Sequence, residues 1–254
     1  MGTAAYAAMG TYRFATTSPK LAISQIVISG NERATDLEIR AWLGIAEGDN
    51  ILRADTQAAE LRLAEHPWVE KAIVSRSFPQ GLAIEVLERE AIALVELGHL
   101  YLVDRGGEVF KRAVNGDPMD LPVITGLSRD EWTERPDEAQ TKLGEVLGAL
   151  GIYGESEIAK SHPVSELHFD QTEGLTLYLG DRGLAAKLGS GDLERKLDRL
   201  AQVVGFAERR GESLELVRLD NRTRPGWIAA RLRSEGGPTR LSLRASEKGR
   251  SKGG

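Results

Sequence analysis

The chain has 254 residues, of which 41% are hydrophobic and 28% charged, an ordinary composition for a soluble globular protein. Its net charge of −5 gives no general attraction for nucleic acid. It contains no cysteine, which excludes disulfides and thiolate metal sites. The most apolar N-terminal stretch, residues 4–10, is far shorter than the roughly 20 residues that a membrane helix needs.

Residues 21–91 are predicted to form a small α/β domain with the order strand, helix, helix, strand, strand. A strand is expected over 26–30, and a helix then begins at Thr35. The sequence Thr-Asp-Leu-Glu at this point has the pattern of a capping box, in which the threonine and Glu38 each satisfy a free backbone amide. Gly44 is placed to end the helix, because glycine readily adopts the left-handed conformation.

The second helix of this domain is expected to begin near Asp55 or Thr56 and to end before Pro67. Its spacing predicts that the side chains facing the core are Ala58, Leu61 and Ala64. Alternating residues over 72–86, interrupted by Pro-Gln-Gly, predict a β-hairpin after it.

From residue 92 onward, short alternating segments predict a mostly antiparallel β domain that ends near residue 244 and contains two helices. The helices are expected over 137–153 and 192–208, where apolar residues recur at spacings of three and four. The tail, 245–254, is small and charged and is expected to be disordered. Strands are expected over 100–103, 108–111, 165–170, 175–179, 184–188, 214–219, 227–233 and 239–243.

Catalytic and metal-binding motifs are hard to find in this sequence. The four histidines, His66, His99, His162 and His168, form no ligand pair with metal-binding spacing, so structural or solvent-facing roles are favoured. No nucleophile elbow or phosphate-binding glycine loop is present, and the glycine clusters lie between strands, where turns explain them. The protein is therefore predicted not to be an enzyme and to need no cofactor.

The order of elements in residues 21–91 resembles a POTRA domain, a module that holds other proteins. Several sequence blocks carry a more specific resemblance than the order of elements. They are HPWVEKAIVSRSFP and LAIEVLERE, then LYLVDRGGEVF and LPVITG, then LTLYLGDRGLAAKLGSGDLERKLDRLAQVV and LVRLDNRTRPGWIAARL. These blocks, from about residue 19 to 232, resemble the extracytoplasmic part of the FtsQ/DivIB family of bacterial cell-division proteins. The resemblance implies an α+β protein, with a POTRA domain followed by the mostly antiparallel β domain.

The same resemblance implies a location and a missing segment. Members of this family are single-pass inner-membrane proteins with their bulk in the periplasm at the division septum, and their membrane helix lies just upstream of the POTRA domain. Residues 1–20 are therefore expected to be a residual membrane-proximal linker, and the anchor itself to be missing from this chain.

Partners also follow from the resemblance. The family acts as a scaffold between early and late division proteins and binds FtsB and FtsL, with an FtsB segment adding a strand to the last strand of the β domain. Upstream proteins such as FtsK are associated with the POTRA domain. By position, the FtsB edge is 220–233 in this chain. Its expected partner-binding residues are Arg222, Thr223, Gly226, Trp227, Ile228, Ala229 and Arg231.

Several alternatives stay open at this point. Ile228, Ala230 and Leu232 are expected to face the core, whereas Trp227 either anchors a partner or packs against a helix of its own domain. If residues 239–243 pair with 227–233 as a hairpin, they occupy the edge that the partner strand would take. The POTRA edge, either the strand at 23–30 or the hairpin at 72–86, is the second candidate docking surface. A POTRA-type chaperone for outer-membrane or secretion assembly and a periplasmic carbohydrate-active or carbohydrate-binding protein are the alternative functions.

Overall fold

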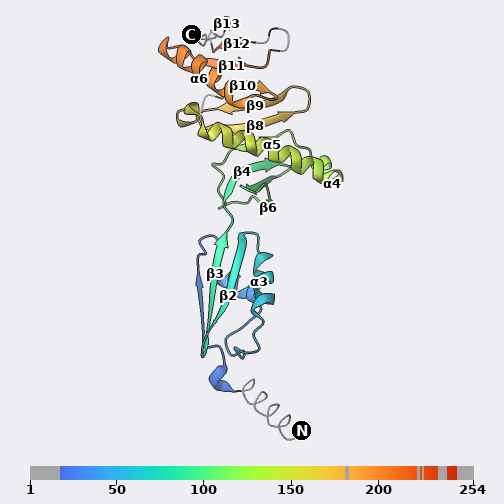
Figure 1. The fold of residues 1–254 in the computed structure, drawn as a ribbon, viewed down its shortest axis with the longest axis vertical. Coiled ribbons are helices and arrows are strands. Elements are labelled where there is room, and N and C mark those ends of the chain that lie inside the picture. Colours follow the sequence, from blue (N-terminus) through green and yellow to red (C-terminus); the bar gives the residue numbers. More distant parts are fainter. Residues whose placement is uncertain (1–17, 181–182, 222–223, 225, 234–238, 245–254) are drawn as a thin grey trace, which may run out of the picture. The chain divides into compact units, whose positions relative to one another are not determined.

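The computed structural model describes residues 18–180, 183–221, 224, 226–233 and 239–244, with the last range described by its backbone only. The chain divides into two compact units, Met1–Glu90 and Ala91–Gly254, which we call the smaller and the larger unit. Figure 1 shows that each has its own sheet. Most of the predicted linker and the whole predicted tail lie outside the described residues.

The smaller unit contains the predicted order of strand, helix, helix, strand, strand. Its sheet has the order β1-β3-β2, in which β1 is parallel to β3 and β2 is antiparallel to β3. A short 3-10 turn, η1, precedes the first strand. The bounds are η1 Pro19–Leu21, β1 Gln25–Ser29, α2 Asp36–Leu43, α3 Thr56–Ala64, β2 Val69–Ser77 and β3 Gly81–Glu88.

The capping box at the start of α2 is confirmed. The Thr35 hydroxyl oxygen accepts from the Glu38 amide at 3.2 Å, and the Glu38 carboxylate accepts from the Thr35 amide at 2.8 Å. Gly44 ends the helix with a φ of 66°, as predicted. These contacts join residues three positions apart, so the local sequence is enough to specify them.

The predicted inner face of α3 is wrong. Ala59 and Leu63 are buried on this helix, whereas Leu61 is 72% exposed and Ala64 is also exposed. The helix has small or apolar residues on several sides, so its spacing alone does not single out one face. Packing against β2 selects the face with Ala59 and Leu63, and Ala58 is left half-buried.

The sheet of the smaller unit is buried on one face only. Alternate residues of its strands, such as Ile26, Val74 and Ile84, are buried on the face that α2 and α3 cover. On the opposite face, Val27 and Ile73 remain 49% and 46% exposed. The alternation matches the period of two that a half-buried strand requires.

The larger unit contains a mixed sheet that is antiparallel except at the neighbours β4–β7, β7–β8 and β10–β11. Within the described residues, the sheet has ten strands in the order β13-β12-β11-β10-β9-β8-β7-β4-β5-β6. The strands are β4 Ala91–Glu96, β5 Leu100–Asp104, β6 Val109–Arg112, β7 Val123–Thr125, β8 Val164–Asp170, β9 Gly174–Leu179, β10 Leu184–Gly189, β11 Leu214–Arg218, β12 Trp227–Leu232 and β13 Thr239–Arg244.

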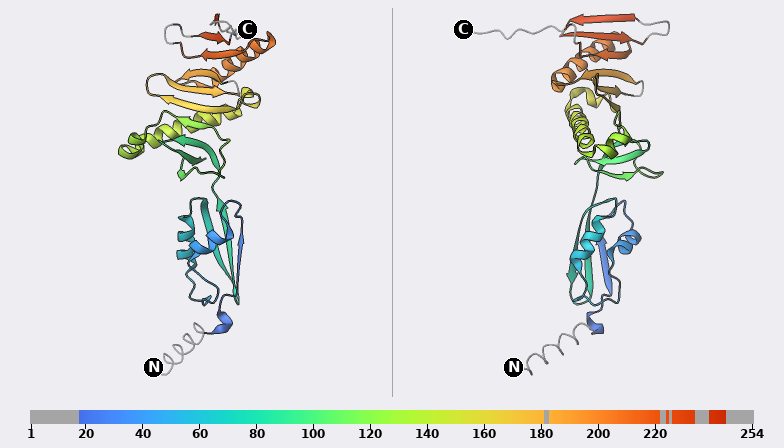
Figure 2. Two further views of the ribbon diagram at one scale, coloured as in Figure 1. Left: turned by 180° about the vertical axis from the view of Figure 1, so that it is seen from behind. Right: turned by 90° about the vertical axis from the view of Figure 1, so that its right-hand side faces the viewer.

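The helices of the larger unit are α4 Arg129–Glu134, α5 Pro136–Glu155 and α6 Leu193–Arg209, with a 3-10 turn η2 at Glu157–Lys160. The two predicted helices correspond to α5 and α6, and α4 is a short third helix that the prediction missed because it has no apolar periodicity. Figure 2 shows α5 and α6 along one face of the sheet, where their apolar side chains meet those of β8 to β12 in one core. No helix in the described part of the chain has the length and apolarity needed to cross a membrane.

Candidate functional site

The candidate site is the end of the larger sheet formed by β11, β12 and β13. On β12, Ile228 and Ala230 are buried in the core of the larger unit and Leu232 is half-buried, which agrees with the predicted inward face. Ala229 is exposed on the opposite face, where Trp227 and Arg231 are half-buried. The strand therefore presents one apolar face inward and a mixed face away from the helices.

Trp227 lies where the chain turns into β12. The Arg224 guanidinium lies 5.7 Å from the centre of the Trp227 ring, a cation–π distance. The Gly226 carbonyl accepts a hydrogen bond of 2.8 Å from Arg199 of α6. Gly226 has a φ of 91°, which explains why glycine is used at this turn. Of the predicted partner-binding residues, Arg222 and Thr223 lie outside the described part of the chain.

The outer side of β12 pairs with β13. The register runs from Trp227 opposite Arg244 to Leu232 opposite Thr239, without a shift. Because β12 also pairs with β11 on its other side, its backbone groups bond on both sides within this chain. The free edge at this end of the sheet is therefore that of β13 among the described strands, and β12 is not an open edge.

Charged side chains of β10, β11 and β12 lie on the face of the sheet away from the helices. In register, Lys187 of β10 is next to Arg218 of β11, which is next to Ala229 of β12. Glu173 forms ion pairs with both Lys187 and Arg218, the latter at 3.9 Å. The hydrogen bond from Lys187, then the charges of Lys187 and Arg218, lower the pKa of Glu173. Arg231 lies 3.8 Å from Glu215.

Two of the histidines, His66 and His168, have ordinary structural contacts. His66 accepts from the Trp68 amide at 3.3 Å and meets the Trp42 ring edge-on, and His168 shares a 2.8 Å hydrogen bond with Thr125. No cluster of three or more His, Asp or Glu side chains in the described residues could hold a metal ion. These contacts give His66 and His168 a role in packing and in hydrogen bonding.

At the edges of the smaller sheet, which are the second candidate surface, side chains of the helices form hydrogen bonds with the strand backbone. The Glu60 carboxylate of α3 accepts from the Val74 amide of β2 at 2.8 Å. The Arg40 guanidinium of α2 donates to the Ile26 carbonyl of β1 at 2.9 Å. A charged group thus bonds to one backbone group of each edge strand, and charged side chains at edges are a known protection against unwanted strand pairing. Sequence patterns did not reveal these two contacts, because each joins residues at least 14 positions apart.

Comparison with known proteins identifies both units. The family model described as POTRA domain, FtsQ-type, matches residues 21–89, and the model described as Cell division protein FtsQ/DivIB, C-terminal, matches residues 91–220. These matches confirm the predicted resemblance and the fold class of a POTRA domain followed by a sheet-rich domain.

Curated relatives agree with the family models. The chain is 43% identical over 221 residues to the Cell division protein FtsQ of Anaeromyxobacter sp. (strain K), covering 87% of this chain and 75% of that protein. It is 35% identical to the protein of the same name from Myxococcus fulvus, covering 86% of this chain and 76% of the relative. The corresponding figures for Geotalea daltonii are 33%, 84% and 78%. From these matches and from the fold, the chain belongs to the FtsQ/DivIB family of cell division proteins.

Proposed function

We propose that this chain is a non-catalytic scaffold of the bacterial division machinery that binds partners by strand addition at the β12–β13 end of the larger sheet. The observation that carries this proposal is the unshifted pairing of β12 with β13, at the end of a sheet whose last described strand, β13, has one unpaired side. An unpaired strand offers backbone donors and acceptors to a partner segment. Family membership supports a role in cell division.

The partners that we propose are FtsB and FtsL at the larger sheet, and upstream division proteins such as FtsK at the POTRA domain. The resemblance to FtsQ supports these names, and it also supports a single-pass location in the inner membrane at the septum, with the bulk in the periplasm. Because Arg40 and Glu60 bond to backbone groups at the edges of the smaller sheet, we expect an upstream protein to contact other surfaces of the POTRA domain. The relatives' names refer to cell division, and no observation favours a chaperone or a carbohydrate-active protein.

Two geometries satisfy strand addition at the larger sheet. In the first, the partner strand displaces β13 and pairs with β12, so that Trp227, Ala229 and Arg231 flank it. In the second, β13 stays in place and the partner pairs with its outer side. Trp227 serves as an anchor in the first geometry, because an aromatic side chain offers a large contact area at a small entropic cost.

Binding of a peptide from the periplasmic part of the same organism's FtsB tests the proposal. The variants are Trp227→Ala and a chain that ends at Arg233, and Trp42→Ala, which alters a partly exposed tryptophan of the smaller unit, is the matched control. Displacement predicts that truncation strengthens binding and that Trp227→Ala weakens it by about tenfold or more, the cost of a typical hot-spot truncation. Addition to β13 predicts that truncation weakens binding. If no version of the chain binds the peptide, strand addition at this end is wrong.

A further inference from the structure

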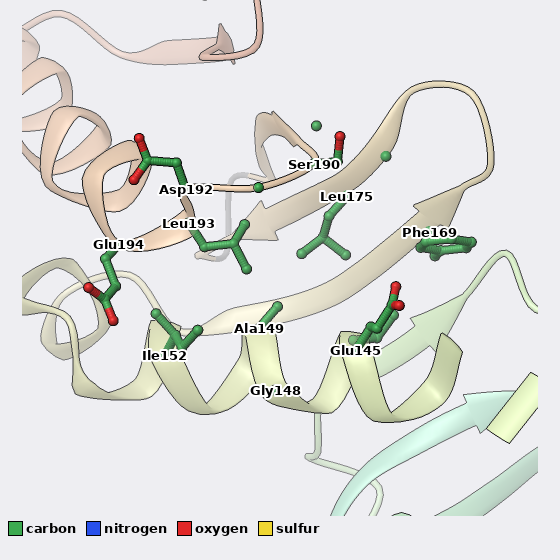
Figure 3. A pocket seen from close by; sticks show the side chains of 14 residues that line it. Glu145, Gly148, Ala149, Ile152, Phe169, Leu175, Ser190, Asp192, Leu193 and Glu194 are labelled. Carbon is green, nitrogen blue, oxygen red and sulfur yellow. The ribbon is translucent and has the colours of Figure 1, made fainter. Parts of the chain in front are cut away.

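A groove in the larger unit lies between α5, the end of β8, the start of β9 and the loop that leads into α6. Its volume is about 550 Å³. Figure 3 shows Leu175 and Leu193 on one side and Ala149 and Ile152 of α5 on the other, all pointing into the groove. Apolar side chains thus form its walls, and none of its lining residues belongs to β12 or β13.

Gly148 keeps the groove open on the α5 side. A Cβ atom built on Gly148 would meet no heavy atom within 4 Å, although its neighbour Ala149 is buried. A larger side chain at position 148 would therefore project into free space instead of the core. Because Gly148 lines the groove, such a side chain would narrow it from the α5 side.

Carboxylates lie at both ends of this groove. Glu145 lies toward one end and Glu194 toward the other, as Figure 3 shows. Neither forms an ion pair with another described residue, whereas Asp192 lies 3.8 Å from Arg195, which offsets its charge. Two negative charges therefore flank an apolar centre.

We propose that this groove is a docking site for a partner peptide that carries one bulky apolar side chain between two basic residues. The apolar side chain would enter between Leu175, Leu193 and α5, and the basic residues would pair with Glu145 and Glu194. An acidic peptide would be repelled by the same carboxylates.

Selection of randomised peptides displayed on phage, with the whole chain as bait, tests this proposal. The enriched peptides are expected to carry an apolar residue flanked by Lys or Arg. A synthetic peptide of the enriched sequence should bind the Gly148→Leu variant about tenfold or more weakly. Gly154→Leu is the matched control, because it is an exposed glycine of the same helix that does not line the groove and has equally open surroundings.

Charge variants provide the second readout. Glu145→Gln with Glu194→Gln should weaken binding at low salt, and the difference should shrink as salt screens the charges. The control, Glu134→Gln with Glu155→Gln, removes the same net charge from exposed positions outside the groove. No enrichment, an acidic consensus, or binding that Gly148→Leu leaves unchanged would each overturn the proposal.

Two further measurements distinguish a partner peptide in the groove from the chain's own tail and from the proposed strand addition. The tail carries the basic residues Lys248, Arg250 and Lys252. If deletion of 245–254 makes the selected peptide bind more tightly, the tail is the occupant of the groove, and the proposal of a partner peptide is wrong. The FtsB peptide should bind wild type and Gly148→Leu equally. Loss of FtsB binding therefore tests the proposed strand addition, and loss of the selected peptide tests the groove.

Discussion

At the scale of single residues, close backbone contacts and buried carboxylates place demands on individual positions. Gly126, directly after β7, has a φ of 90°, and a Cβ atom there would lie 1.9 Å from the Phe169 carbonyl oxygen of β8. Gly116 has a similar φ of 100° but open surroundings. The two glycines therefore separate the cost of backbone strain from the cost of a steric clash.

Gly126→Ala should lower the free energy of unfolding by more than Gly116→Ala does. Both substitutions place a side chain at positive φ, which costs on the order of 1–3 kcal/mol, but only Gly126→Ala also pushes β7 away from β8. We expect the Gly126 variant to lose about 2 kcal/mol more, in line with the cost of overpacking. Chemical denaturation of both variants measures the difference. Equal losses would show that the strands adjust freely.

Glu131 of α4 is buried and pairs with Lys142 of α5. The hydrogen bond from Lys142, and then the charges of Lys142 and Arg135, lower its pKa below the ordinary 4.5, although burial opposes the shift. A carboxyl group with a lowered pKa in the folded state stabilises the fold above its ordinary pKa. That contribution is lost as the pH falls through the lowered folded-state value.

Stability measured from pH 6 downward should therefore fall less steeply in Glu131→Gln than in the wild type, below about pH 4.5. The amide side chain of the variant does not titrate, so its stability lacks this pH-dependent contribution. Glu134→Gln changes an exposed residue of the same helix and is the control. A wild type and a Glu131→Gln variant with parallel pH profiles would contradict the assigned role of the Lys142 contact.

At the scale of elements, the two sheets treat their edges differently. In the smaller sheet, α2 and α3 each send one charged side chain to an edge strand. In the larger sheet, β13 pairs with β12 along its whole length. In the smaller sheet, a side chain thus occupies one backbone group of each edge strand. In the larger sheet, β13 covers β12, so the exposed edge is that of β13.

Glu60→Ala should accelerate hydrogen exchange of the Val74 amide by about fivefold or more, because one hydrogen bond contributes about 1 kcal/mol. The carboxylate is the partner of that amide on the outer side of β2. Glu65→Ala, an exposed change just after the same helix, should leave the exchange rate unchanged. Exchange is measured residue by residue by NMR. An unchanged Val74 rate in Glu60→Ala would show that the contact does not protect the edge.

At the scale of the whole molecule, each of the two units buries its own set of apolar side chains among the described residues. The main core cluster consists entirely of residues of the larger unit. The smaller unit has its own buried set, which includes Ile39, Leu43, Leu63, Leu82 and Ile84. Each unit thus contains the apolar contacts that an independently folded domain requires.

A fragment of residues 1–90 should fold without the larger unit. We expect a well-dispersed amide spectrum, because the smaller unit buries its own set of apolar side chains. Its stability should be only a few kcal/mol, because small domains bury less of their surface. The measurement is an NMR spectrum of the fragment, followed by denaturant unfolding. A collapsed, poorly dispersed spectrum of the fragment would contradict two independent cores.

The sequence alone determined the features that depend on neighbours in the chain. The capping box of Thr35 and Glu38, the end of α2 at Gly44 and the inward positions of Ile228 and Ala230 follow from short-range patterns. Family motifs added the two-part architecture, because their order and spacing extend over most of the chain. Each of these features is specified by residues a few positions apart or by a long ordered set of blocks.

Only the tertiary structure decided which surfaces are open. The inner face of α3 depended on packing against β2, so Ala59 and Leu63 replaced the predicted set. That β13 covers β12 depended on strand pairing, which alternation within a single strand does not specify. The hydrogen bonds of Glu60 with Val74 and of Arg40 with Ile26 join residues that are distant in the chain. The groove beside Gly148 is likewise lined by residues from distant segments. Such contacts depend on how whole elements pack against each other, and local sequence patterns do not specify that packing.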